Sequence, residues 1–206
     1  MINLNKYIIE KLKLSKDIKN NYKYFPKTKG ELISILEEKG YRSKRKLDLN
    51  DIDVSKITDM EELFKRCGNL SELDVSDWDV SNVITMKDLF AQCKNIKKIS
   101  CENWDVSNVV CMSGIFNFCE KLDVDLSEWD MSNVKYADGM FSACKKFTGK
   151  GLENWNVEYL ESAVAMFSGS DAQFDISLWN PKNLKKMNFM LTNTKLKAPS
   201  WYSRKI

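Results

Sequence analysis

Residues 73–83 read LDVSDWDVSNV, and similar segments return about every 26 residues along the chain. Successive tryptophans within these segments are 26, 25, 26 and 24 residues apart. They are Trp78, Trp104, Trp129, Trp155 and Trp179, with Ile52 one step earlier and Trp201 one shorter step later. One unit of this length is too small to bury its own apolar face, so the repeat predicts units that stack on one another.

Other residue types keep a fixed distance from each tryptophan. Apolar pairs such as Leu73 and Val75 stand five and three residues before it, which is the two-residue period of a β-strand. Met or Ala stands eight residues after it and mostly Phe twelve after it, as at Met86 and Phe90, a spacing of one helical turn. We therefore expect a strand, a turn and a short helical segment in each unit, with the strands in one parallel sheet.

These motifs resemble a known family of repeats. The segment 73–83, together with Met-Ser-Gly-Ile-Phe at 112–116, is similar to the bacterial surface-protein repeats of roughly 26 residues, the BspA-like type of leucine-rich repeat. The resemblance covers about residues 47–200, and residues 156–159 depart from it by replacing Asp-Val-Ser-Asn with Asn-Val-Glu-Tyr. The resemblance implies a leucine-rich solenoid used for binding, of bacterial or phage origin, and it implies no catalytic residues.

The predicted fold class is α/β. We expect a leucine-rich-repeat-like solenoid of six units of about 26 residues with parallel strands, closed by a strand around Leu196–Trp201 and covered by a helical N-terminal cap. The cap is predicted over residues 1–46 and the repeat domain over residues 47–206. Within the cap we expect helices over about 3–14 and 29–39. Thr28 and Glu31 form a capping box for the second helix, which Gly40 ends.

The reactive side chains favour structural roles over catalysis. The chain has no histidine, the commonest general base and metal ligand, so we expect no enzyme activity, cofactor or metal. A column of cysteines at Cys67, Cys93, Cys119 and Cys144 predicts buried small residues, with thiolate ligands for zinc as the alternative. For the tryptophans we expect a core role, with stacking platforms for bases or sugars as the alternative.

A second column is acidic and runs through Asp53, Asp79, Asp105 and Asp130. Aspartate accepts hydrogen bonds from turn backbone well, so we expect these side chains to cap turns. Calcium binding by stacked carboxylates is the alternative.

Binding is predicted on the outward face of the strands. Residues four and two positions before each tryptophan point away from the core, because strand side chains alternate. These two columns contain small and acidic residues and no Lys or Arg. The predicted partner-binding residues are Asp48, Asp74, Glu102, Asp125, Glu153 and Asp175. Stacked carboxylates repel one another, so the stripe favours a protein partner with a basic segment, although keeping an exposed sheet soluble is an equally simple reason for it.

The predicted function is thus a protein–protein interaction module. The alternative is a structural, surface or virion-associated component, adhesin-like, that self-assembles. Residues 1–46 contain 13 Lys and Arg against 5 Asp and Glu, which raises a third hypothesis of nucleic-acid binding. The lysines alternate with apolar helix positions, which argues against it. No stretch is apolar enough to span a membrane and no signal-peptide pattern is seen, so a cytoplasmic location is expected, with surface or virion association as the alternative.

Overall fold

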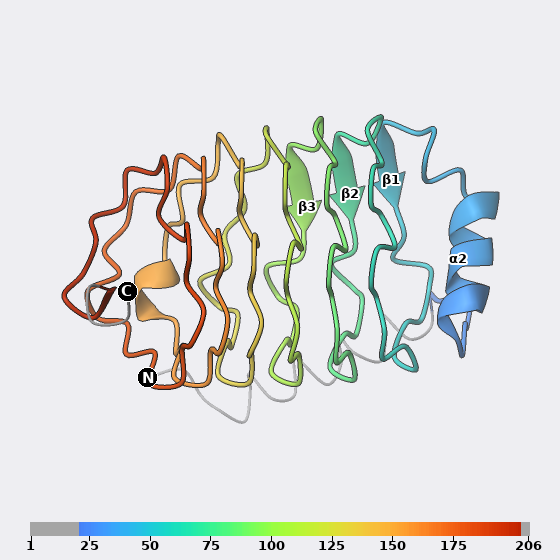
Figure 1. The fold of residues 1–206 in the computed structure, drawn as a ribbon. Helices are drawn as coiled ribbons and strands as arrows, with labels where there is room; N and C mark the ends of the chain where they lie inside the picture. The colour runs from blue at the N-terminus through green and yellow to red at the C-terminus, as the bar shows by residue number, and fades with distance from the viewer. Residues whose placement is uncertain (1–20, 203–206) are drawn as a thin grey trace, which may run out of the picture.

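A computed structural model describes residues 21–202 of the chain. Its elements are, in order, the helix α2 (Lys29–Glu38), the strands β1 (Lys46–Asp48), β2 (Glu72–Asp74) and β3 (Lys98–Ser100), and the 3₁₀ turn η1 (Leu152–Asn154) (Figure 1). The strands form a parallel sheet in the order β1-β2-β3. The remaining described residues are turns and loops. The repeated segments of about 26 residues, each of which we call a run of chain, lie side by side between α2 and the C-terminal end (Figure 1).

The predicted α/β leucine-rich-repeat-like solenoid of six strand-containing units is wrong. Within residues 21–202 there are three short strands, none of them after Ser100, and α2 is the only α-helix. The helical segment expected in each unit is a series of turns, and the closing strand around Leu196–Trp201 is not formed.

Turns are found where helical segments were expected, because their backbone N–H groups donate hydrogen bonds to the next run of chain. In residues 60–67, the N–H of Met60 donates to the carbonyl of Thr85 at 3.0 Å and the N–H of Phe64 to that of Leu89 at 2.9 Å. An α-helix would instead bond each N–H to the carbonyl four residues earlier. Glu62 and Arg66 also have φ of 61° and 63°, in the left-handed region that an α-helix excludes.

The strand expected before Trp155 is not formed, for local reasons. The N–H of Thr148 donates to the carboxylate of Asp123 at 3.2 Å, whereas the equivalent N–H of Lys97 donates to the backbone carbonyl of Ser71 at 2.8 Å. Gly149 and Gly151 follow with φ of 76° and 86°, which no strand adopts. The 3₁₀ turn η1 then lies where the strand of this unit was predicted.

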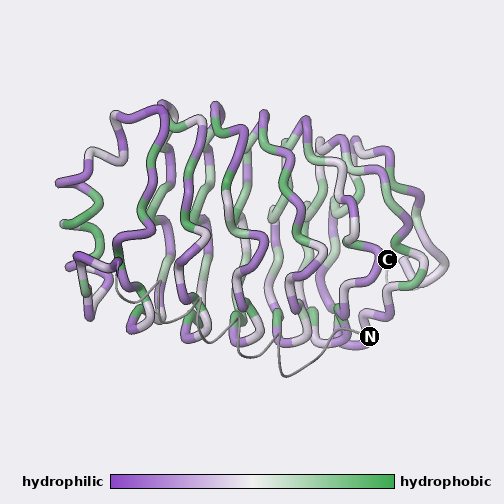
Figure 2. The backbone as a smooth tube through the Cα atoms, turned by 180° about the vertical axis from the view of Figure 1, so that it is seen from behind, coloured by the Kyte–Doolittle hydropathy of each residue, from purple (hydrophilic) through white to green (hydrophobic). Residues whose placement is uncertain are grey.

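Equivalent aromatic residues stack through the core. Phe64 and Phe90 have ring centroids 5.4 Å apart, and the indoles of Trp78 and Trp104 are 6.3 Å apart and within 2° of parallel. Each indole N–H donates to a carbonyl in the preceding run of chain, as Trp104 does to Val75 at 2.9 Å. The prediction of a core role for the tryptophans is confirmed. Hydrophobic residues accordingly recur at equivalent places in neighbouring runs (Figure 2).

Helix α2 covers the N-terminal end of this core. The N–H of Glu31 donates to Thr28 Oγ1 at 3.2 Å, so the predicted helix and its N-cap are confirmed. Leu32 and Leu36 are fully buried in the core, and Gly40 follows with φ of 69°. The helix predicted over residues 3–14 lies outside the described residues.

Candidate functional site

The outward face of the sheet carries charged side chains in register. On β1, Leu47 is buried while its neighbours Lys46 and Asp48 are exposed. Parallel pairing places Asp48 beside Asp74, and Asp74 beside Ser100. These side chains surround a shallow hollow over the three strands. Its polar lining consists of Lys46, Asp48, Glu72, Asp74, Lys98 and Ser100.

The sequence argument missed the lysines of this face. Lys46, Glu72 and Lys98 form a third outward column, six residues before each tryptophan or its equivalent. Lys46 Nζ lies 2.8 Å from Glu72 Oε2 in an exposed ion pair. The predicted stripe therefore continues into a column of mixed charge. Extending the two-residue alternation one step further back would have found it.

The structure separates the six predicted binding residues into groups. Asp48 and Asp74 line the hollow over β1–β3. Glu153 and Asp175 line a second hollow, which also includes Lys150. Glu102 and Asp125 line neither of these hollows. The predicted stripe is thus two acidic pairs on two hollows, with two further carboxylates outside them.

Turn hydrogen bonds hold several of these carboxylates in place. Asp74 Oδ1 accepts from the N–H of Ser76 at 3.1 Å and from its hydroxyl at 2.8 Å. Partial burial alone would raise the pKa of Asp74, but hydrogen bonds from Asn50 and Ser76 lower it. Hydrogen bonds from Ser127 likewise lower the pKa of Asp125. These groups are therefore fixed, ionised acceptors.

Asp77 lies close to the same face. Burial raises its pKa, and the negative charges of Asp74 and Asp48 raise it further. Its backbone N–H donates to Asn50 Oδ1 at 2.9 Å, and its carbonyl accepts from the Tyr22 hydroxyl at 3.1 Å. Negative potential is therefore concentrated around β1 and β2, where a basic partner group would be attracted.

The second acidic column caps turns, as predicted. Asp79 Oδ1 accepts from the N–H and the hydroxyl of Ser81, and Asp105 binds Ser107 in the same way. Asn108 reaches across to donate to the Ser81 carbonyl at 2.8 Å. In residues 21–202, no three carboxylate or thiol groups come together in a way that could hold a metal ion.

The cysteine column is buried, as predicted. The thiols of Cys93, Cys119 and Cys144 donate to the carbonyls of Phe64, Phe90 and Phe116, at 2.9 to 3.1 Å. The four cysteines of the column are at most 1% exposed: Cys67 1%, Cys93 0%, Cys119 0% and Cys144 1%. Burial raises the pKa of the Cys144 thiol to about 12, so it stays protonated and unreactive at neutral pH.

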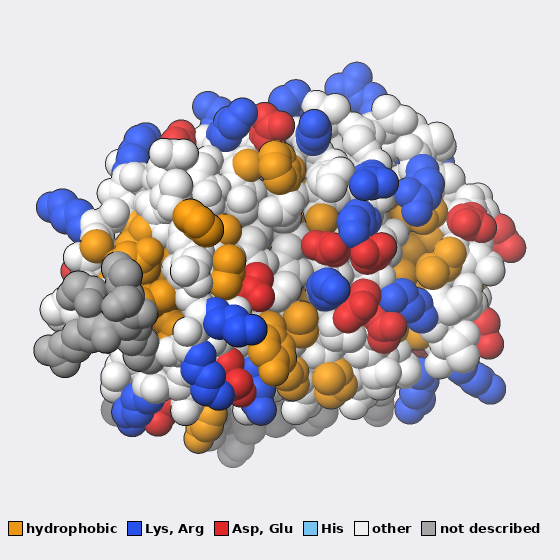
Figure 3. Space-filling view, viewed as in Figure 1, with side chains coloured by type: hydrophobic (Ala, Val, Ile, Leu, Met, Phe, Trp, Pro, Cys, Tyr) orange, Lys and Arg blue, Asp and Glu red, His pale blue; other side chains and the backbone are white. Residues whose placement is uncertain are grey.

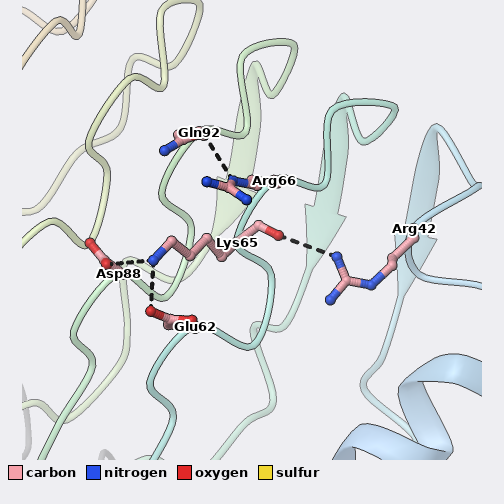
Figure 4. Close-up of polar contacts among 6 residues, drawn as sticks. All are labelled: Arg42, Glu62, Lys65, Arg66, Asp88 and Gln92. Atoms are coloured by element: carbon pink, nitrogen blue, oxygen red, sulfur yellow. Dashed lines mark hydrogen bonds and ion pairs between the residues drawn. The ribbon is translucent and has the colours of Figure 1, made fainter.

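The opposite, turn-bearing side has its own charged network near α2 (Figure 4). Lys65 Nζ bridges Glu62 Oε1 at 2.6 Å and Asp88 Oδ2 at 2.9 Å, while Arg42 donates to the Lys65 carbonyl at 3.3 Å. In the space-filling view, acidic and basic side chains are intermixed on the half of the surface next to α2 (Figure 3). These charges largely pair with one another, so this network stabilises neighbouring runs of chain.

Comparison with known proteins gives one family. The family described as "Mycoplasma protein of unknown function, DUF285" matches residues 36–150 and 89–201. Searches of curated proteins and of solved structures gave no match. Nowhere in residues 21–202 is there a helix with the length and apolar character that crossing a membrane requires. Because the two matches together include most of the chain, the protein belongs to the DUF285 family.

Proposed function

We propose that this chain is a non-enzymatic protein-interaction module that binds a basic segment of a partner protein across the outward face of β1–β3. The observation that carries the proposal is the hollow over the three strands, where Asp48 and Asp74 lie side by side. The turn bonds to Asp74 fix its carboxylate before a partner arrives, which lowers the cost of ordering on binding. The resemblance of residues 47–200 to bacterial surface-protein repeats supports a binding role.

Charge on this face also supports the choice of partner. Asp48, Glu72 and Asp74 line the hollow together with Lys46 and Lys98, and the charges of Asp48 and Asp74 also act on nearby Asp77. Glu102 and Asp125 extend the acidic surface beyond the hollow, and Glu153 and Asp175 provide a second place for a long partner segment. A basic partner would be steered to such a face, with faster association at low salt.

Titration calorimetry at low salt tests the proposal with a synthetic 12-residue peptide of alternating Lys and Ser. The variant neutralises three carboxylates of the hollow: Asp48→Asn, Glu72→Gln and Asp74→Asn. Asparagine keeps an oxygen for the turn bonds from Asn50 and Ser76, so the fold should remain intact. We expect binding to weaken by roughly tenfold, as the loss of a few exposed charge pairs predicts.

The matched control neutralises three exposed carboxylates elsewhere, through Glu38→Gln, Glu128→Gln and Asp171→Asn. It makes the same change in net charge and should bind the peptide nearly as the unmodified protein does. Equal weakening in both variants would show that net charge alone attracts the peptide, and the sheet face would then not be the site.

A further inference from the structure

Backbone donors point in one direction along the turn side of the molecule. In one run of chain, Ala163, Ala165 and Phe167 donate their N–H groups to the carbonyls of Lys186, Asn188 and Met190, at 2.8, 2.8 and 3.1 Å. Earlier runs follow the same rule, each donating to the run that comes after it. The final run must therefore present its donors to whatever lies beyond the end of the stack.

The final turn segment is residues 187–193, which we call the donor edge. It keeps the conformation of its predecessors, since Phe189 and Asn193 have φ of 60° and 54° where Ala165 and Gly169 have 53° and 68°. Yet within residues 21–202 no acceptor is present for the N–H groups of Met187, Phe189, Leu191 and Asn193. Four aligned donors without acceptors form an unpaired edge, which templates the addition of another chain.

Among residues 21–202, the C-terminal segment covers the other side of this end. The indole of Trp201 donates to the Ile176 carbonyl at 3.1 Å, which continues the tryptophan ladder by one step. On the donor edge, the side chain of Phe189 is 68% exposed and Asn193 is exposed, while Met187 is buried. The N-terminal end differs, since α2 covers it and Arg42 donates to the carbonyl of Lys65.

Charge at this end indicates what would cover it. Residues 176–202 contain five lysines and no Asp or Glu. Lys182, Lys185 and Lys195 reach back to carboxylates of the preceding run. Lys186 is exposed and forms no ion pair with the described residues, whereas the charge of Lys197 acts on Asp175 and helps to lower the pKa of that carboxyl. The open end therefore combines backbone donors with unneutralised positive charge.

We propose that the donor edge at residues 187–193 binds an extended acidic segment of another protein, whose backbone carbonyls accept from Met187, Phe189, Leu191 and Asn193. Lys186 contacts a carboxylate of that segment, and Phe189 covers its apolar side chains. Addition of a chain to an unpaired edge is an established mode of peptide recognition. This surface is distinct from the hollow over β1–β3 and selects a partner of opposite charge.

A second copy joined end to end fits this edge poorly. At its N-terminal end, residues of α2 lie next to Glu61, Glu62 and Leu63, so an approaching copy would meet the helix before the backbone of that run. Residues 21–46 of that end carry eight Lys and Arg and three Glu, so two basic ends would meet. Like charges facing each other at an interface disfavour the association.

Hydrogen exchange measured by NMR tests this inference with a 12-residue peptide of alternating Glu and Val. We expect the amides of the donor edge to exchange at least about tenfold more slowly when the peptide is bound. Met190 and Thr192 serve as internal controls, since their N–H groups already donate to Met187 and Phe189 at 3.1 Å. Their exchange should change little.

Charge reversal by Lys186→Glu should weaken peptide binding by roughly three- to tenfold. The control Lys94→Glu makes the same change in net charge at another exposed position and should have little effect. Peptide binding without protection of the donor edge, or equal weakening by the two variants, would overturn the inference. Protection by a single-stranded DNA oligonucleotide and not by the peptide would also overturn it, in favour of a nucleic-acid partner.

Discussion

Gly114 is the position where a single methyl group should disturb the stack most. Its φ is 66°, and a Cβ built there would lie 2.0 Å from Asp88 Oδ1. The left-handed conformation alone should cost alanine about 1–2 kcal/mol. Asp88 must also move, which weakens its half-buried ion pair with Lys65 (Figure 4) and adds about 0.5–1 kcal/mol. Gly114→Ala should therefore destabilise the fold by about 1.5–3 kcal/mol.

Thermal unfolding followed by tryptophan fluorescence measures this loss, and Tm should fall by roughly 5–10 °C. Gly139→Ala is the matched control, because Gly139 occupies the equivalent position with φ of 59° and its Cβ would lie 3.3 Å from the flexible amide of Asn117. Its Tm should fall by roughly 2–5 °C, from the backbone conformation alone. Ala165, with φ of 53°, shows that this turn accommodates a Cβ. Equal losses in the two variants would refute the role assigned to the Asp88 contact.

Three further predictions concern the core and the acidic face. Ser170 has a buried hydroxyl with no partner among the described residues. Ser170→Cys extends the cysteine column and should raise the free energy of unfolding, measured in urea, by about 1 kcal/mol. A lower free energy of unfolding in this variant would contradict the prediction. Iodoacetamide at pH 8 should label the partly exposed Cys111 well before the buried Cys144. Comparable labelling rates, measured by mass spectrometry, would show that the cysteine column opens readily. The pKa values of Asp74 and Asp125 are lowered in the fold, so the ionised carboxylates stabilise the fold above the unfolded pKa of 3.8, and this stabilisation is lost as the pH falls through the lowered folded pKa. The Tm of the double variant Asp74→Asn, Asp125→Asn should therefore depend less on pH between 5 and about 2 than the Tm of the unmodified protein. An unchanged pH dependence would contradict the role of these two carboxylates.

Side-chain columns could be read from the sequence because each depends only on spacing. Burial of the tryptophans and cysteines follows from their fixed phase, and the N-cap of α2 follows from the short-range pattern of Thr28 and Glu31. The acidic binding residues were harder to place. Spacing puts Asp48 and Asp74 on one face, but it does not show that Glu102 lies outside the hollow or that Lys46 lies inside it.

Backbone conformation was not readable in the same way, and this explains the error in the fold class. Met86 and Phe90 are four residues apart and both buried, as they would be in a helix. The turns achieve the same burial with Asp88 and Gln92 at positive φ, positions that glycine occupies at Gly114 and Gly139 but other residues occupy elsewhere. A helix would have used its N–H groups internally, whereas these turns direct them to the next run of chain. The same property leaves residues 187–193 with donors to offer, so the feature that spacing could not reveal is the one that makes the C-terminal end a candidate for binding.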